Sequence, residues 1–431
     1  MSFPTYPTYK DSGVEWLGEV PEHWVMGSLK NMAQIRNGRD YKEVESSDGE
    51  YPVIGSGGQF SNATQYLYEG ESVLLGRKGT IDKPLYINGR FWTVDTMFYT
   101  EISKGACAKF FYYNSLTIPF GYYSTSTALP SMTQADLLNH PAAIPTKLEQ
   151  TQIARFLDHE TARIDSLIEE QQRLIELLKE KRQAVISHAV TKGLDPTVPM
   201  KDSGVEWLGE VPAHWESLTL GRVASSVKTG GTPSDDLPSS DIIDGVEWYT
   251  PGDFTGDLLL DSSEKRVSAG AVRSGDAKVF PSGSVLIVSI GATLGKVGHI
   301  RRPASANQQI NAVVPGPRVD GYFLAYSLSV KINAMRFLSN ASTIGIMNQE
   351  KTKEIWLSLP PLQEQKLITE FLDKQTSVID TLIQEAAGGV ALLQERRSAL
   401  ISAAVTGKID VRGWQPPASS QAHESAVAEA V

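Results

Sequence analysis

The side chains that could carry catalysis are few, and none forms a recognised catalytic arrangement. Carboxylates near a lysine, as a metal-dependent nuclease would use them, occur at Glu169, Glu170, Glu176 and Glu180. All four lie in a stretch of helical periodicity, where such charges are typical of a solvated helix face. These carboxylates are therefore interpreted as surface charge.

Other kinds of site are also missing. His23 and His214 each precede a tryptophan, but no second ligand lies at metal-binding spacing, which favours a structural role. No GxGxxG or GxxxxGK[ST] loop is present, and no Ser/His/Asp or Cys/His set stands out. The sequence predicts no catalytic residue, no metal site and no cofactor bound by this chain.

Composition narrows the class of protein. A chain of 431 residues predicts two or more domains. No apolar run reaches membrane-spanning length, and the N-terminus has no signal-peptide pattern. The single cysteine, Cys107, fits a reducing cytoplasm, which is the expected location. The net charge of −10 does not favour nucleic acid, so DNA binding would need local basic patches or a basic partner.

Two repeats organise the chain. Residues 10–24 read KDSGVEWLGEVPEHW and residues 201–215 read KDSGVEWLGEVPAHW, an offset of 191. Residues 145–195 align without gaps on residues 360–410, an offset of 215. The stretch between the repeats is thus 24 residues longer in the second copy, and it shows little similarity. This pattern predicts two domain-sized copies with alike ends and unlike middles.

The unlike middles, residues 25–143 and 216–358, have the pattern of α/β domains. Short β-type runs alternate with glycine turns, as in GSVLIVSIGATLGKVGHI, which predicts two strands broken at Gly291. The pair Asn88-Gly89 predicts a hairpin turn. The stretches GRKGTIDK (76–83) and SIGATLGK (289–296) correspond weakly. The two regions are interpreted as diverged versions of one domain.

The long repeats, 145–195 and 360–410, predict two helices that pack as a coiled coil. Apolar residues recur at heptad spacing in the same register in both. Prolines precede each helix, and Gly193 and Gly407 follow, as helix punctuation should. The seam is predicted to contain Leu157, Ile164, Ile168, Ile175 and Leu178 of the first helix, and Leu372, Ile379, Ile383, Leu393 and Leu400 of the second.

Further apolar residues widen this stripe, so each helix is expected to bury a second face against its own domain or a partner. Gly388-Gly389 interrupts the second helix at a cost of roughly 2 kcal/mol relative to alanine, which predicts local weakness or a close backbone approach. Residues 411–431 are rich in proline, alanine and serine and are expected to be disordered.

A chain built as motif, variable region and long helix, twice over, resembles the specificity subunit of type I restriction–modification systems. The resemblance rests on the GVEWLGEVPxHW openings, the LPPLQEQ start at residues 359–365, the FLDxxTxxID runs at Phe156 and Phe371, and ANQQINAV at residues 306–313. It covers nearly the whole chain except the tail, and it is weaker in the variable regions.

The resemblance implies a non-catalytic DNA reader of α/β (α+β) class. Two pseudo-symmetric target-recognition domains, residues 1–144 and 196–359, would each read half of an asymmetric bipartite site in double-stranded DNA. Two long antiparallel coiled-coil helices, residues 145–195 and 360–410, would separate them and dock methyltransferase subunits. S-adenosylmethionine, ATP and Mg would be held by partner subunits, including a motor-nuclease restriction subunit.

For such a reader, donors and acceptors must reach base edges, and lysine and arginine must reach phosphates. The candidates in the first domain are Arg77, Lys78, Thr80, Lys83 and Arg90. Those in the second are Lys296, Arg301, Arg302, Asn307, Gln308 and Gln309. The structural alternative is that Asn307 and Gln308 bond to strand backbones and that the arginines are surface charge.

Two other classes of protein stay open. The chain could be a scaffold whose coiled coil tethers two non-DNA ligand-binding domains, with aromatics such as Trp92 and Trp248 lining the sites, although aromatic residues more often pack in a core. A DNA-modifying enzyme with an unrecognised site is disfavoured by the missing motifs.

Overall fold

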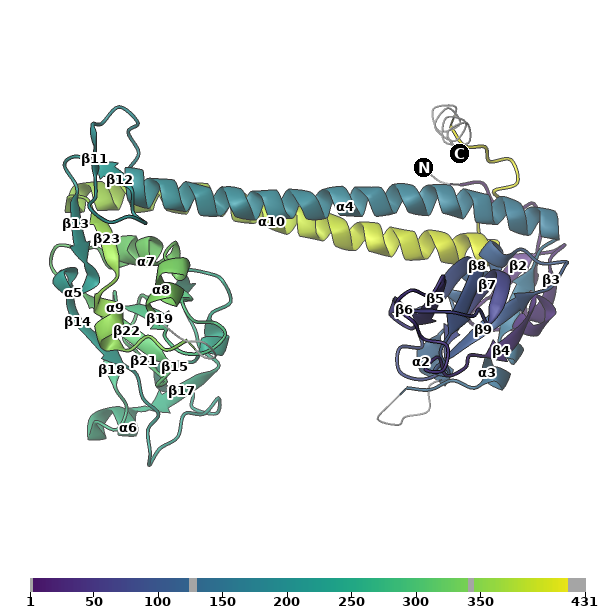
Figure 1. Ribbon diagram of the computed structural model, residues 1–431, viewed down its shortest axis with the longest axis horizontal. Coiled ribbons are helices and arrows are strands. Elements are labelled where there is room, and N and C mark those ends of the chain that lie inside the picture. The colour runs from purple at the N-terminus through teal and green to yellow at the C-terminus, as the bar shows by residue number, and fades with distance from the viewer. Residues whose placement is uncertain (1–2, 124–129, 340–344, 418–431) are drawn as a thin grey trace. The chain divides into compact units, whose positions relative to one another are not determined.

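The computed structural model describes residues 3–123, 130–339 and 345–417. The chain divides into two compact units, one of residues 1–172 and 387–431 and the other of residues 173–386. Both boundaries fall inside the long helices α4 (Lys147–Lys192) and α10 (Leu362–Val405) (Figure 1). Each unit therefore contains one half of each long helix together with one variable region.

The first unit is built on a six-stranded sheet in the order β4-β9-β7-β8-β5-β6. Neighbouring strands are antiparallel except β5 and β8, which are parallel. The strands are β4 (Ala33–Asn37), β5 (Tyr51–Gly55), β6 (Gly58–Ala63), β7 (Tyr68–Gly76), β8 (Leu85–Thr93) and β9 (Met97–Ile102). Two small sheets pair β1 (Tyr9–Asp11) with β2 (Glu19–Pro21), and β3 (Val25–Ser28) with β10 (Pro141–Ile144). The short helices are η1 (Leu29–Asn31), α1 (Ala108–Ser115), α2 (Phe120–Tyr123) and α3 (Gln134–Asn139).

The core of the first unit joins the sheet to both long helices. Phe110 and Phe111 of α1 are fully buried, and they share a cluster with Phe156 of α4 and Ile401 of α10. Burial of such large side chains contributes about 1.5–3 kcal/mol each, so this cluster fixes α1 between the sheet and the helix pair.

The two larger sheets among the described residues of the second unit are a five-stranded sheet β14-β22-β19-β20-β16 and a four-stranded sheet β17-β15-β21-β18. The strands of the first are β14 (Ala224–Thr229), β16 (Leu259–Leu260), β19 (Val285–Val288), β20 (Val297–Ile300) and β22 (Ile310–Pro315). Those of the second are β15 (Gly245–Tyr249), β17 (Lys265–Ser268), β18 (Val279–Phe280) and β21 (Ala304–Ala306). The pair β19 and β20, joined by residues 289–296, confirms the two strands predicted around Gly291.

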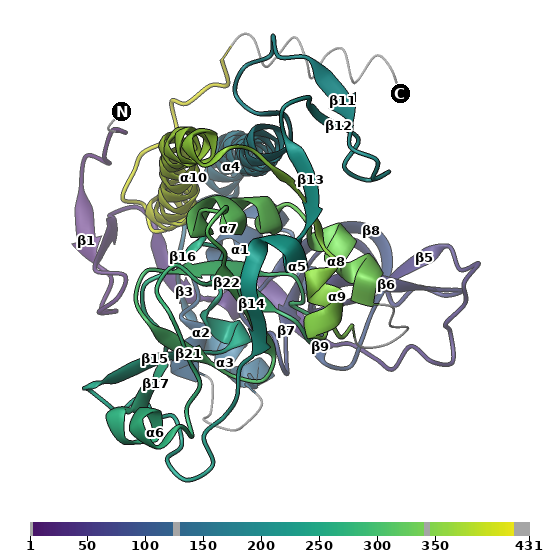
Figure 2. The same ribbon diagram turned by 90° about the vertical axis from the view of Figure 1, so that its left-hand side faces the viewer.

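Small sheets and helices complete the second unit. Strand β11 (Met200–Asp202) pairs with β12 (Glu210–Pro212), and β13 (Glu216–Thr219) pairs with β23 (Trp356–Leu359). The short helices are α5 (Leu220–Val223), η2 (Pro251–Asp253), α6 (Ala269–Ser274), α7 (Gly321–Ser329), α8 (Ile332–Ser339) and α9 (Gln349–Lys353). Figure 2 shows α7 between the long helices and the five-stranded sheet of this unit, the position that α1 takes in the first unit.

The long helices are antiparallel. In the first unit Arg397 Nε lies 2.8 Å from Asp165 Oδ1, and in the second unit Arg182 Nε lies 2.8 Å from Asp380 Oδ1. All ten predicted seam residues are buried or half-buried. The predicted α/β class with an antiparallel coiled-coil pair is thus confirmed. The αL conformation of Gly193 (φ 78°) and Gly407 (φ 73°) ends the two helices as predicted.

Two local expectations are wrong, the hairpin at Asn88-Gly89 and the disorder of residues 411–417, and one of the two alternatives for Gly388-Gly389 is excluded. Asn88-Gly89 forms no hairpin turn but lies inside β8, where Gly89 (φ 116°) pairs with Gly70 (φ 128°) of β7, and both glycines adopt a backbone conformation that other residues rarely take. Helix α10 runs unbroken through Gly388-Gly389, and a Cβ at either glycine would meet nothing within 4 Å, so the close backbone approach is not present.

The expected disorder of residues 411–431 is wrong for residues 411–417. Val411 is 1% exposed, and the Trp414 ring packs edge-on against Phe156 at 5.3 Å between centroids. Gln152 of α4 also donates its side-chain amide to the Trp414 carbonyl oxygen at 2.6 Å. This apolar and polar docking on α4 orders the segment despite its composition, and residues 418–431 lie outside the described part of the chain.

Candidate nucleic-acid interface

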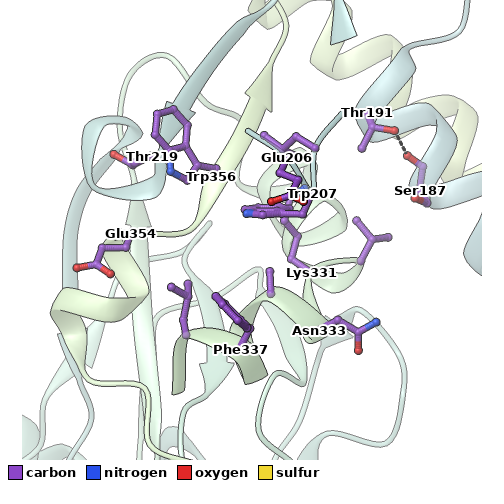
Figure 3. A pocket seen from close by; sticks show the side chains of 14 residues that line it. Ser187, Thr191, Glu206, Trp207, Thr219, Lys331, Asn333, Phe337, Glu354 and Trp356 are labelled. Atoms are coloured by element: carbon purple, nitrogen blue, oxygen red, sulfur yellow. Dashed lines mark hydrogen bonds between the residues drawn. The ribbon is translucent and has the colours of Figure 1, made fainter. Parts of the chain in front are cut away.

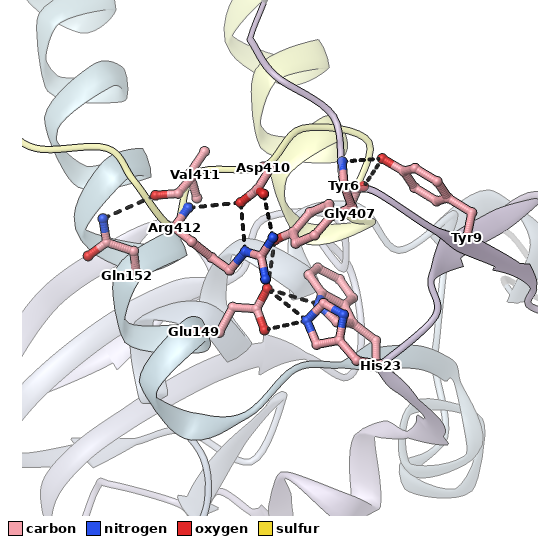
Figure 4. Close-up of polar contacts among 10 residues, drawn as sticks. Tyr6, Tyr9, His23, Glu149, Gln152, Gly407, Asp410, Val411 and Arg412 are labelled. Atoms are coloured by element: carbon pink, nitrogen blue, oxygen red, sulfur yellow. Dashed lines mark hydrogen bonds and ion pairs between the residues drawn. The ribbon is translucent and has the colours of Figure 1, made fainter.

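The repeated opening is anchored to the start of each long helix through a carboxylate. In the first unit Glu149, 6% exposed, accepts the indole N–H of Trp24 at 3.1 Å and lies 3.0 Å from His23 Nε2. The Tyr6 hydroxyl donates to the same carboxylate at 2.7 Å (Figure 4). Burial, assisted by this bond, raises the pKa of Tyr6, which therefore stays a donor.

The second unit repeats this anchor. Trp215 donates its indole N–H to Glu364 at 3.1 Å, and His214 Nε2 lies 2.8 Å from the same carboxylate. Each histidine thus contacts the carboxylate that anchors the repeated opening of its own unit. Among the described residues no group of three or more His, Cys, Asp or Glu side chains could hold a metal ion.

The remaining repeated residues fix each variable region to its helix. Gln150 accepts the Cys107 N–H at 2.9 Å, and its counterpart Gln365 accepts the Asp320 N–H at 2.8 Å. The Tyr113 hydroxyl donates to Asp158 at 2.9 Å. The second unit has the same bond, at 2.8 Å, from Tyr326 to Asp373. The same frame therefore presents two different sheets.

In the first unit, loops meet at the edge of the sheet where β7 ends. The Arg77 N–H donates to the Thr96 carbonyl at 2.9 Å, and the Gly79 N–H donates to the Pro130 carbonyl at 2.9 Å. Lys78, Thr80 and Lys83 are exposed on this edge. The glycines of the loop allow close backbone approach to a ligand, and the lysines supply positive charge.

Two arginines of the predicted set behave differently. Arg77 is half-buried, and its guanidinium donates to the Asp95 carbonyl at 3.3 Å beside the Phe98 ring. Arg90 lies in β8, five residues beyond the end nearest the loop, and it is paired with Glu69 at 3.1 Å. The structure therefore brings Arg77, Lys78, Thr80 and Lys83 together but places Arg90 apart from them.

In the second unit, the corresponding edge lies where β19 ends and β22 begins. The Ser289 N–H donates to the Gln309 carbonyl at 2.7 Å, which joins the loop of residues 289–296 to the loop of residues 307–309. Gln308 is exposed and accepts the Thr232 hydroxyl at 2.8 Å. Gln308 and Gln309 therefore lie at this edge with the loop that follows β14.

The other second-unit candidates are scattered. Arg301 and Arg302 are exposed in the turn after β20, at the opposite end of these strands from Gln308. Asn307 is only 8% exposed, and its side chain bonds to Gln309 within the turn, which matches the structural alternative for that residue. Lys296 donates to the Phe254 carbonyl at 2.7 Å, away from the glutamines.

Two exposed basic residues at these edges were missed from the sequence. Arg39 follows Gly38, whose Cβ would lie 2.0 Å from the Val94 carbonyl oxygen. In the second unit a Cβ at Gly230 would lie 2.2 Å from the Ala306 carbonyl oxygen. Lys278 lies beside the same loop, because its ammonium donates to the Thr229 carbonyl at 3.2 Å. In both units the sequence signal was a glycine directly after a strand, Gly38 after β4 and Gly230 after β14, where the chain passes close to the backbone of another segment.

Trp92 and Trp248, the aromatic residues named for the alternative of a ligand-binding scaffold, are buried and do not line a ligand site. Trp92 and Trp248 are each 8% exposed, and both donate their indole N–H to a neighbouring backbone carbonyl at 3.1 Å. They pack in cores, which is the use that the sequence favoured.

The outer faces of the long helices are partly apolar. Of the flanking residues, Phe156, Ile186 and Ile401 are buried against their own units. Others are between 38% and 68% exposed, namely Leu167, Leu174 and Leu177 of α4 and Leu367, Phe371, Val378, Leu382 and Leu392 of α10. No helix in the described ranges is long and apolar enough to cross a membrane.

Comparison with known proteins agrees with this architecture. The family model of the type I restriction modification DNA specificity domain matches residues 21–178 and again residues 212–386. The chain therefore belongs to this family of specificity subunits.

Among its relatives, the type I restriction enzyme EcoBI specificity subunit of Escherichia coli is 20% identical over 435 residues, which is 94% of this chain and 90% of the relative. The putative MjaX specificity subunit of Methanocaldococcus jannaschii is 24% identical over 286 residues, 65% of this chain and 62% of the relative.

Solved structures share the fold. A chain from a study of complex assembly and conformational transition of the type I R-M system has a TM-score of 0.70 at 17% identity, covering 90% of this chain and 98% of the solved chain. The HsdS subunit from Thermoanaerobacter tengcongensis has a TM-score of 0.51 at 16% identity, with coverage of 90% and 98%.

Proposed function

We propose that each unit reads one half of an asymmetric, bipartite site in double-stranded DNA. The observation that carries this proposal is the contrast between the repeated anchoring residues, which are alike in the two units, and the loops at the sheet edges, which differ. The tryptophan and histidine contacts of Glu149 recur at Glu364, whereas the loops that the two sheets present differ in sequence. The first edge presents two lysines and two arginines and the second presents Gln308, Gln309 and Lys278, so the two half-sites should differ in sequence as well.

The long helices would serve as the spacer. At about 1.5 Å per residue, helices of 46 and 44 residues are long enough to separate two readers by at least one turn of DNA, about 34 Å. Their exposed leucines, together with Phe371 and Val378, would dock the methyltransferase subunits, because exposed apolar stripes mark interaction sites.

In this account the chain is non-catalytic and works in the cytoplasm. S-adenosylmethionine would be held by the methyltransferase subunits, and ATP and Mg by a restriction subunit with motor and nuclease activity. A net charge of −10 makes basic partners useful for holding the duplex.

Binding to duplex DNA at several salt concentrations, with and without methyltransferase subunits, tests the proposal. Affinity should fall steeply with salt, because phosphate contacts release counterions. Replacing Arg77 and Lys78 with alanine should weaken recognition of one half-site only. Salt-independent binding, or an equal loss at both half-sites, would overturn the proposal.

A further inference from the structure

A hollow of about 1040 Å³ lies in the second unit beside the first tryptophan of the repeated motif. Its walls come from the C-terminal part of α4, from α8 and from strands β13 and β23. Three aromatic side chains line it, and Figure 3 shows how they surround the opening: Trp207, Phe337 and Trp356. Trp207 is 47% exposed and Phe337 is 81% exposed, so large apolar surfaces stand open to solvent.

Lys331 lines this hollow and is only 6% exposed. Its Nζ lies 4.7 Å from the centroid of the Trp207 ring, and within the described ranges no side chain or carbonyl forms an ion pair or hydrogen bond with it. Burial lowers the pKa of Lys331 to about 8, so most of these amines are still charged at neutral pH. A buried ammonium without a counter-ion is destabilising, and an incoming anion would relieve that cost.

The first unit has no such cation at the matching place. Lys331 follows Tyr326 by five residues, and the residue five positions after Tyr113 is the buried Ile118. There Trp16 stacks instead on His140, with 5.0 Å between ring centroids and 19° between planes. Burial lowers the pKa of His140 to about 4, so this ring is neutral. At this place in the fold, within the described residues, the unpaired charge therefore occurs in the second unit and not in the first.

The other charges of the hollow restrict which anion could enter. Glu206 and Glu354 also line it, and neither pairs with Lys331. Figure 3 shows Glu354 pointing away from the lysine. These carboxylates would repel a polyanion such as a DNA backbone. A single carboxylate on an apolar segment, which can use the aromatic walls, suits the site better.

We propose that this hollow docks an acidic side chain, flanked by apolar residues, from a partner polypeptide. Lys331 is its counter-ion, and Trp207 and Phe337 form the apolar walls. Ser187 and Thr191 of α4 border the hollow, so the inference rests on the proposed docking of methyltransferase subunits along this helix and deepens it. The partner at the second unit gains a contact that the first unit does not offer.

The chemistry of the site can be tested on the free full-length chain. Tryptophan fluorescence is followed during titration with 2-naphthoate and with its neutral counterpart 2-naphthamide. Naphthoate should bind about tenfold more tightly, and Lys331→Met should abolish that preference, while the exposed-lysine control Lys265→Met keeps it. Equal binding of the two probes, or a preference that survives in Lys331→Met, overturns the proposal.

A matched pair of tryptophan variants adds a second control. Trp207→Ala should weaken naphthoate binding, whereas Trp16→Ala, at the equivalent place in the first unit, should not. Loss of folding is excluded by thermal melting, because Lys331→Met removes a buried unpaired charge and should raise the melting temperature. A lowered melting temperature would mean that Lys331 has an internal partner, and the proposal would fail.

The source of the carboxylate is tested in the complex with methyltransferase subunits. A carbodiimide joins amines directly to carboxylates in contact, and mass spectrometry identifies the joined peptides. Lys331 should be linked to an Asp or Glu of the partner; links from other lysines of this unit but none from Lys331 would overturn the proposal. If no methyltransferase subunit assembles, the proposed function fails, and the naphthoate titration still decides the hollow.

Discussion

Trp24 donates its indole N–H to Glu149 across 125 residues of chain, and the distance, 3.1 Å, is the same as that between Trp215 and Glu364. This bond ties the repeated opening to the first turn of the long helix in each unit. It gives a physical reason for two nearly identical sequence motifs around dissimilar middles, because both ends of each unit belong to one anchor.

The two anchors should differ in strength. Glu149 is 6% exposed and also accepts the Tyr6 hydroxyl, whereas the Glu364 side chain is 29% exposed and Thr197 stands at the position equivalent to Tyr6. Glu149→Gln should lower the free energy of unfolding by about 2–3 kcal/mol and Glu364→Gln by about 1 kcal/mol, since bonds to a buried charge are the stronger ones. Urea denaturation of both variants measures this, and a larger loss for Glu364→Gln would refute the ranking.

Acid should destabilise the first unit through His140. Burial lowers the pKa of His140 from 6.5 to about 4, so below pH 6.5 the unfolded chain binds a proton that the folded chain refuses. The stability from the neutral ring is present above pH 6.5 and is lost as pH falls toward 4, by up to about 3 kcal/mol.

His140→Gln removes this titrating group. Between pH 7 and pH 5, the wild-type free energy of unfolding should fall by about 2 kcal/mol more than that of the variant. Denaturation curves at the two pH values compare them, and identical pH dependence would show that the ring is not held neutral.

The glycine pair in α10 offers a stabilising change. A Cβ at Gly388 or Gly389 meets nothing within 4 Å, so alanine at either position should raise the free energy of unfolding by about 1 kcal/mol. Gly407→Ala is the matched control and should destabilise, because Gly407 has φ 73° and its Cβ would lie 2.3 Å from Pro21. Thermal melting distinguishes them, and destabilisation by Gly388→Ala would reveal a contact at that glycine.

The crossed ion pairs should couple the helices. Arg397 binds Asp165 through two bonds, at 2.8 and 3.2 Å, and both side chains are partly exposed. A double-mutant cycle with Arg397→Met and Asp165→Asn should give a coupling energy of about 1 kcal/mol. Zero coupling would mean that the pair does not contribute to helix packing.

The heptad periodicity of apolar residues was sufficient to predict the two long helices. The heptad register placed Ile164 and Ile379 in the seam because helical spacing is local information. The ion-pair partners of Arg182 and Arg397, which lie 198 and 232 residues away in the chain, could be known only from the structure.

The recognition edges were predictable only in part. Lys78 and Lys83 sit in a glycine loop that the sequence marks, whereas Arg39 reaches the same edge from a strand that pairs across the sheet. The hairpin turn predicted at Asn88-Gly89 was wrong, because turn propensity takes no account of Gly70, the residue of β7 that pairs with Gly89. Lys331 gave no signal, since a lone lysine becomes unusual only when its burial is known.

Single-molecule sequencing of methylated adenines measures the central claim most directly. The host would carry the methyltransferase subunits with this chain, or with a version in which residues 216–358 are replaced by the variable region of another family member. One half of a bipartite methylated motif should change while the other half and the spacing stay the same. A motif in which both halves change, or neither does, would contradict the assignment of one half-site to each unit.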